Sequence, residues 1–181
     1  MNVEAALRED LLAAIPNLRA FARSLVHNPH RADDLVQDTI VRAWAVIDRF
    51  ERGSNMNAWL FTILRNLFYS QHRKVGREVE DPEGSYAAKL ISAPDQQSHL
   101  EFEDLRTALA KLPLDQREAL LLVGAQGLSY DEVAAITGVA VGTVKSRVNR
   151  ARVQLAKLLN AEPTDEIRPN RVTKAAVQVQ G

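Results

Sequence analysis

Apolar residues recur along most of the chain at spacings of three and four, which places them on one face of an α-helix. In residues 8–27 these positions are Leu11, Leu12, Ile15, Leu18, Phe21, Ala22, Leu25 and Val26. The same period returns from about residue 31 to residue 47 and from residue 58 to residue 72. The aromatic residues expected in the core of these helices are Phe21, Trp44, Phe61 and Phe68. Because the two-residue alternation of a half-buried strand is missing, the pattern predicts an all-α fold.

Breaks in the pattern divide the chain into two small domains. The stretch "HNPH" at 27–30 ends the first helix, and "RFERGSNMN" at 49–57 is a loop that contains a glycine. Residues 76–99 carry two prolines and two glycines and are too long for an ordinary loop, so they are expected to link a domain of residues 1–75 to one of residues 100–160. The polar tail, 161–181, is expected to be disordered.

The second domain contains the layout of a helix-turn-helix. Ser129 and Glu132 form an S-x-x-E capping box at the start of a short helix, and Gly138 is suited to end it in the left-handed conformation. A longer helix is expected from about Val141 to Leu159, although Ala140 offers no side-chain acceptor to cap it. Two helices joined by a short turn with a glycine are typical of this DNA-binding motif.

The last helix divides into a buried and an outward side when each residue advances by about 100°. The expected buried stripe, within about 40° of its first member, is Val144, Val148, Ala151 and Leu155. Ser146, Asn149 and Arg150 fall on the opposite side, with Lys145 at its edge, and Arg147 and Arg152 flank the stripe. Arg and Asn side chains can each form two hydrogen bonds with the edge of one base. We therefore predict that the outward residues read DNA bases and that the flanking arginines reach phosphates. A basic, solvated face on an ordinary helical bundle is the alternative.

The charges are segregated although the net charge is zero. Residues 57–77 hold four Lys and Arg and no acid, residues 140–157 hold five and no acid, and residues 78–104 hold eight acids and one lysine. Two basic segments on either side of an acidic one suit two separate contacts with a polyanion.

Other kinds of site are not expected. There is no cysteine, which excludes disulfides and thiolate zinc sites. The close pair His27 and His30 brackets a proline turn without carboxylate company, so no metal and no cofactor are expected. A glycine-rich phosphate loop after a strand is also missing, and we do not expect an enzyme. The acidic N-terminus is unlike a signal peptide and the longest apolar run is too short for a bilayer, so a cytoplasmic protein is expected.

Three segments together resemble the extracytoplasmic-function (ECF) sigma factors of RNA polymerase. They are "ADDLVQDTIVRAW" (32–44), "NAWLFTILRNLFYSQHRK" (57–74) and "LPLDQREALLLVGAQGLSYDEVAAITGVAVGTVKSRVNRARVQL" (112–155), and the likeness covers about residues 8–160. The resemblance implies that region 2 docks on the β′ clamp helices of the polymerase core and reads and opens the −10 element. It also implies that region 4 reads the −35 element and contacts the β flap.

Two further stretches resemble the general-stress (EcfG) type of these factors. They are "NMNAWLFTILRNLFYS" and "LDQREALLLVGAQG". This resemblance implies that an anti-sigma factor holds the protein until a phosphorylated response regulator with a sigma-like domain removes it. The free protein is expected to be a monomer.

The residues expected to dock on core polymerase share one side of the second helix. They are Asp33, Asp34, Gln37, Asp38 and Val41, at spacings of three and four. An acidic side with apolar neighbours suits a partner helix that carries Arg and Lys, whereas a merely solvated charged face is the alternative.

The residues expected at the −10 element lie in the third helix and in the loop before it. Trp59, Arg65, Asn66, Tyr69 and Arg73 lie away from the apolar stripe of that helix, where they can hold unstacked bases. In the loop, the resemblance points to Arg49, Asn55, Met56 and Asn57 as candidates to capture a flipped base. Met56 stands where many relatives carry an aromatic residue, which leaves the base preference open.

Two other functions remain open from the sequence. A DNA-binding regulator that does not engage polymerase would explain residues 100–160 but not the acidic helix or the first basic helix. A sigma-like decoy that binds an anti-sigma factor would need neither basic helix.

Overall fold

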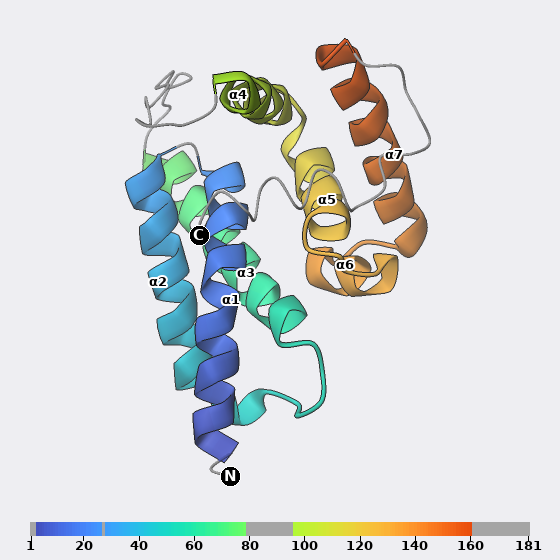
Figure 1. Ribbon diagram of the computed structural model, residues 1–181. Coiled ribbons are helices and arrows are strands. Elements are labelled where there is room, and N and C mark those ends of the chain that lie inside the picture. The colour runs from blue at the N-terminus through green and yellow to red at the C-terminus, as the bar shows by residue number, and fades with distance from the viewer. Residues whose placement is uncertain (1–2, 27, 79–95, 161–181) are drawn as a thin grey trace. The chain divides into compact units, whose positions relative to one another are not determined.

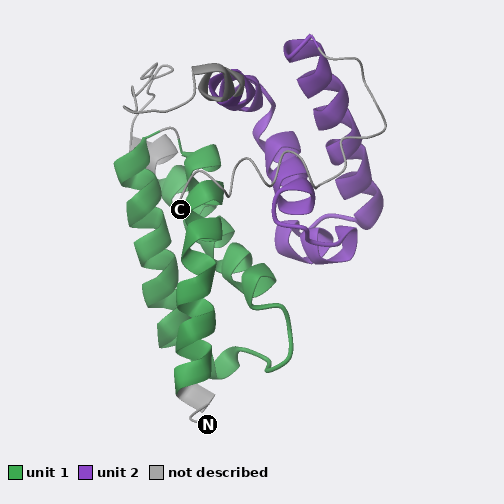
Figure 2. Ribbon diagram, viewed as in Figure 1, with its two compact units in different colours: residues 1–88 green, residues 89–181 purple. Residues whose placement is uncertain are grey.

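The computed structural model describes residues 3–26, 28–78 and 96–160 (Figure 1). Its elements are helices and connecting turns, with no strand in these ranges, so the predicted all-α fold is confirmed. The chain forms two compact units, residues 1–88 and 89–181 (Figure 2). Most of the predicted linker, the whole predicted tail and His27 lie outside the described residues.

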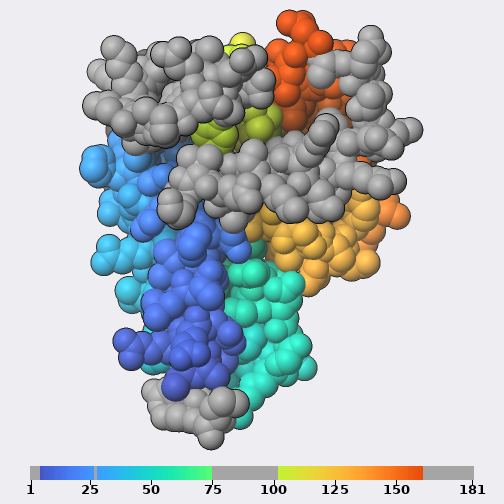
Figure 3. All heavy atoms as spheres, viewed as in Figure 1, coloured from blue at the N-terminus to red at the C-terminus, as the bar shows by residue number. Residues whose placement is uncertain are grey.

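Unit 1 is a bundle of three long helices. They are α1 (Val3–Leu25), α2 (Pro29–Ala45) and α3 (Met56–Glu78), with a 3-10 turn, η1 (Ile47–Arg49), after α2. Each long helix packs against the other two, as Figure 1 shows. In the space-filling view, side chains of α1 (dark blue) and of the beginning of α3 (turquoise) adjoin on the surface (Figure 3). Helix α1 begins earlier than the sequence indicated, and α3 takes in Met56 and Asn57 from the predicted loop.

Local side chains explain where two of these helices begin. The Oδ1 of Asn28 accepts hydrogen bonds from the backbone N–H groups of His30 (3.0 Å) and Arg31 (3.2 Å), and Pro29 occupies the first helical position. The Oδ1 of Asn55 accepts from the N–H of Ala58 at 3.2 Å at the start of α3. The expected break at "HNPH" is therefore a capped helix start.

The core of unit 1 is built from aromatic and leucine side chains. The rings of Phe21 and Phe61 meet edge to face at 5.1 Å, and Phe68 is also buried. The expectation was wrong for Leu12 and Trp44, which are 53% and 42% exposed. Each follows a buried residue by one position, about 100° around the helix, which takes it beyond the narrow stripe that the two neighbouring helices cover.

Within its described residues, unit 2 contains four helices, and the last two of them form the predicted helix-turn-helix. They are α4 (Gln96–Ala110), α5 (Leu114–Gly124), α6 (Tyr130–Thr137) and α7 (Val141–Leu158). Helix α7 packs mainly against α5 and α6 and touches α4. Helix α4 begins before the start expected for the second domain.

The predicted helix caps of the motif are confirmed. The Oγ of Ser129 accepts from the N–H of Glu132 at 3.1 Å, and the Glu132 carboxylate accepts from the N–H of Ser129 at 2.8 Å. Gly138 ends α6 with φ of 70°, in the left-handed region, and Ala140 gives α7 no side-chain cap. Both ends of α6 are therefore set by residues at those ends.

Candidate nucleic-acid interface

Helix α7 packs against the other helices of unit 2 through the expected apolar stripe. Val144, Val148, Ala151 and Leu155 are all buried, as is Ala156 in the last turns. This contact decides which way the remaining side chains face. The stripe predicted from the sequence is confirmed, and the phase of the helix is thereby known.

The outward side of α7 carries donors and no acid. Lys145, Asn149 and Arg150 are exposed, and Ser146 is half-buried beside them. No acidic residue occurs between Val141 and Leu158. A face of this chemistry can bond base edges and can approach phosphates without repulsion.

Residues of the neighbouring helices hold two basic side chains of α7. The Nε of Arg147 lies 3.1 Å from the Oδ2 of Asp115 at the start of α5. On the other flank, the Nζ of Lys145 lies 5.7 Å from the ring centre of Tyr130 at the start of α6. Neither partner was identified from the sequence, because each contact joins residues of different helices and leaves no local signal.

Arg152 is packed against the unit more closely than its position on the wheel suggested. It is half-buried, and its Nε is buried with no hydrogen-bond partner among the described residues. Helix α5 also carries two buried charged residues, Arg117 and Glu118, and burial lowers the pKa of the Arg117 guanidinium. The interior of unit 2 is therefore more polar than its apolar stripe alone indicates.

In unit 1, the structure keeps four of the five predicted docking residues together on the surface of α2. Asp34, Gln37, Asp38 and Val41 are exposed, with Val41 63% exposed. The Oδ2 of Asp38 also accepts a hydrogen bond from the Nε2 of Gln71 on α3, at 3.2 Å. The unexpectedly exposed side chain of Trp44 adds apolar surface to the same helix.

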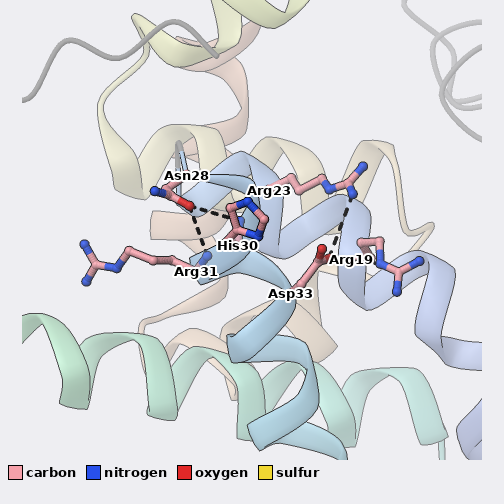
Figure 4. A network of polar contacts seen from close by, with 6 residues as sticks. All are labelled: Arg19, Arg23, Asn28, His30, Arg31 and Asp33. Atoms are coloured by element: carbon pink, nitrogen blue, oxygen red, sulfur yellow. Dashed lines mark hydrogen bonds and ion pairs between the residues drawn. The ribbon is translucent and has the colours of Figure 1, made fainter. Parts of the chain in front are cut away.

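The fifth residue, Asp33, is turned toward α1 (Figure 4). Its Oδ1 lies 3.1 Å from the Nε of Arg19 and 3.9 Å from the Nη2 of Arg23. Asp33 follows the fully buried Ala32 and lies on the edge of α2 that meets α1. Its carboxylate therefore joins two helices of the bundle, unlike the exposed carboxylate of Asp34.

The predicted −10 residues of α3 differ in how freely they face solvent. Asn66 and Arg73 are exposed. The guanidinium of Arg65 lies over the ring of Tyr69, 4.5 Å from its centre, and the half-buried ring of Trp59 lies 5.2 Å from that of Phe50. The aromatic rings are thus partly covered by their own unit.

The residues predicted to capture a flipped base lie between the end of η1 and the first turn of α3. Arg49 is exposed at the end of η1, Asn55 caps α3, and Met56 and Asn57 are half-buried in its first turn. The capping role of Asn55 was missed, although an Asn just before a helical pattern is a signal for it.

Across the described residues, each helix is too short or too polar to span a lipid bilayer.

Comparisons with known proteins match the two units separately. Residues 12–78 match the family described as Sigma-70 region 2, and residues 102–155 match Sigma-70, region 4. Over 181 residues the chain is 59% identical to the ECF RNA polymerase sigma factor EcfG of Rhodopseudomonas palustris, covering 100% of both chains. The chain belongs to the ECF RNA polymerase sigma factors.

Two more similar proteins extend this result. This sigma factor is 44% identical over 138 residues to the ECF sigma factor SigC of Mycobacterium tuberculosis, which covers 74% of the present chain and 72% of SigC. Its fold is similar to a chain in the co-crystal structure of the sigma factor RpoE with the anti-sigma factor NepR from Bartonella quintana. That match has a TM-score of 0.76 and 52% identity and covers 87% of this chain and 98% of the other. The family resemblance seen in the sequence is thus confirmed.

Proposed function

We propose that this sigma factor brings core RNA polymerase to its promoters by reading the −35 element with α7. The observation that carries the proposal is the division of α7 into two sides. Its apolar stripe is buried on its own unit, so Lys145, Asn149 and Arg150 are left outward on a helix without acids. A recognition helix presents donors to the major groove in this way.

Unit 1 supplies the second half of the proposal. The exposed side of α2 with Asp34, Asp38 and Val41 offers carboxylates beside apolar surface, which suits a basic polymerase helix such as those of the β′ clamp. The exposed Asn66 and Arg73 of α3, with the loop before it, form the proposed contact with the −10 element. Unit 2 is further proposed to contact the β flap.

The action proposed is placement and not catalysis. Two weak DNA readers carried on one polymerase reach joint specificity because binding of the first raises the effective concentration of the second. A zero net charge gives the isolated chain little long-range attraction for DNA, so specificity depends on the assembled holoenzyme.

Regulation by an anti-sigma factor is part of the proposal. The similarity to EcfG of Rhodopseudomonas palustris and to RpoE of Bartonella quintana, solved with its anti-sigma factor NepR, supports it. We propose that this chain is likewise held by an anti-sigma factor, serves general stress response genes and acts in the cytoplasm with the polymerase.

Run-off transcription with core polymerase and a genomic promoter library tests the proposal. Specific transcripts are expected from core plus this protein and not from either alone. The reversal variant Asp34→Lys/Asp38→Lys should reduce them, whereas Asp10→Lys, an exposed reversal on α1, should not. Tight sequence-specific binding by the isolated chain without any specific transcript would instead favour a plain helix-turn-helix regulator.

A further inference from the structure

Asp115 connects the start of α5 to the recognition helix. Its Oδ1 accepts a hydrogen bond from the backbone N–H of Gln116 at 3.0 Å, which holds the carboxylate at the first turn of α5. Its Oδ2 lies 3.1 Å from the Nε of Arg147 on α7. Each oxygen therefore has its own partner, one on each of the two helices that pack against one another.

The contact uses only part of the donor capacity of Arg147. A guanidinium carries five N–H donors in one rigid plane, and Asp115 faces Nε. The guanidinium carries four further N–H groups on its two Nη atoms, beyond the Nε that is paired with Asp115. On the helical wheel Arg147 is three residues before the exposed Arg150, about 60° from it and on the flank of the outward face.

We propose that Asp115 is a positioning residue for promoter binding: it fixes the guanidinium of Arg147 so that its Nη groups meet a DNA backbone phosphate beside the −35 element. The inference rests on the proposed function of α7. The side chain of Arg147 is 22% exposed and that of Asp115 48%, so the pair lies at the edge of the unit, open to a ligand on one side.

The two effects of Asp115 on DNA have opposite signs. A long arginine side chain loses rotamer freedom when it binds, and holding it in place beforehand removes that loss. The carboxylate also repels phosphate, but its charge is paired with the guanidinium of Arg147, whose Nε lies 3.1 Å from the Oδ2 of Asp115. Ordering of Arg147 therefore outweighs repulsion, and Asp115 strengthens binding.

The test compares Asp115→Ala, Asp115→Asn, Arg147→Ala and Asp115→Ala/Arg147→Ala in the holoenzyme. The probe is the promoter duplex selected in the run-off screen, with single-base −35 variants of it, titrated at several salt concentrations. Asp115→Ala should weaken binding about two- to fivefold, as expected for a partly exposed ion pair, and equally for every −35 variant. Asp115→Asn should restore most of the affinity, because its amide oxygen can still accept from Nε.

The double variant isolates the route of the effect. Arg147→Ala should lower the salt slope by about one unit, and Asp115→Ala should add no further loss to it. Tighter binding by both Asp115 variants would overturn the inference, since charge repulsion would then dominate. An equal loss in the Arg147→Ala background would overturn it as well, because Asp115 would act through α5. If either of these results is found but the wild type still transcribes from specific promoters, only the role of Asp115 is refuted and the proposed function stands. If the wild type gives no promoter-specific transcription, both the proposed function and the role of Asp115 are refuted.

Discussion

Replacing Gly138 by alanine should destabilise the turn of the helix-turn-helix, and the structure indicates by how much. Gly138 has φ of 70° and ψ of 26°, and its N–H bonds the carbonyl of Ala134 at 2.9 Å. A Cβ added there meets nothing within 4 Å, so packing contributes no penalty. The left-handed backbone alone costs an alanine about 1–2 kcal/mol, from which reduced freedom of the unfolded chain removes about half. A net loss of about 1 kcal/mol is expected.

Gly142 provides a matched control in the next helix. It lies in the first turn of α7, outside the left-handed region, and a Cβ there also meets nothing within 4 Å. Alanine is favoured over glycine in a helix by about 0.5–1 kcal/mol, so Gly142→Ala should stabilise unit 2. The same chemical change in equally open space is thus expected to have opposite signs at Gly138 and Gly142.

Hydrogen exchange of the amides of α6 and α7 in the full chain measures both effects. Tryptophan fluorescence is unsuitable, because both tryptophans, Trp44 and Trp59, lie in unit 1. A loss of 1 kcal/mol corresponds to about fivefold less protection for Gly138→Ala, and Gly142→Ala should gain about two- to fivefold. If both variants shift protection in the same direction, backbone conformation does not decide the sign and the reasoning fails.

Three further predictions concern function. Arg150→Ala should lose about 1–3 kcal/mol of binding free energy on the preferred −35 sequence and relax the preference at one base pair. Arg152→Ala should weaken binding to all promoters alike and lower the salt dependence of binding by about one unit of slope. A uniform loss of binding across single-base −35 variants for Arg150→Ala would contradict a base contact. Asp34→Lys/Asp38→Lys should weaken core polymerase binding without changing thermal unfolding. In contrast, Asp33→Ala should spare polymerase affinity and lower the unfolding free energy of unit 1 by about 0.2–1 kcal/mol, since its ion pairs are half-exposed. Unchanged polymerase affinity for the double reversal would refute the docking surface. The isolated chain should bind promoter DNA weakly at physiological salt in fluorescence anisotropy, and tight specific binding would count against dependence on core polymerase.

The features that the sequence predicted correctly depend on neighbours within a few residues. The capping box of Ser129 and Glu132 and the left-handed Gly138 satisfy backbone groups of their own helix ends. The stripe that begins at Val144 follows from helical period alone, because any partner must cover the apolar side. Local hydrogen bonds and the helical repeat thus determined the elements and the buried face of α7, whereas the family resemblance came from the sequence of residues 32–44, 57–74 and 112–155.

Contacts between helices were decided by the tertiary structure. Asp33 and Asp34 are adjacent acids, yet only Asp33 meets Arg19, because α1 lies along one edge of α2 and not the other. Arg147 was expected to reach phosphates from the flank of α7, and the tertiary structure adds that the first turn of α5 brings Asp115 beside its Nε. Such pairs join residues far apart in the chain, and a helical wheel contains no information about which neighbour covers each flank.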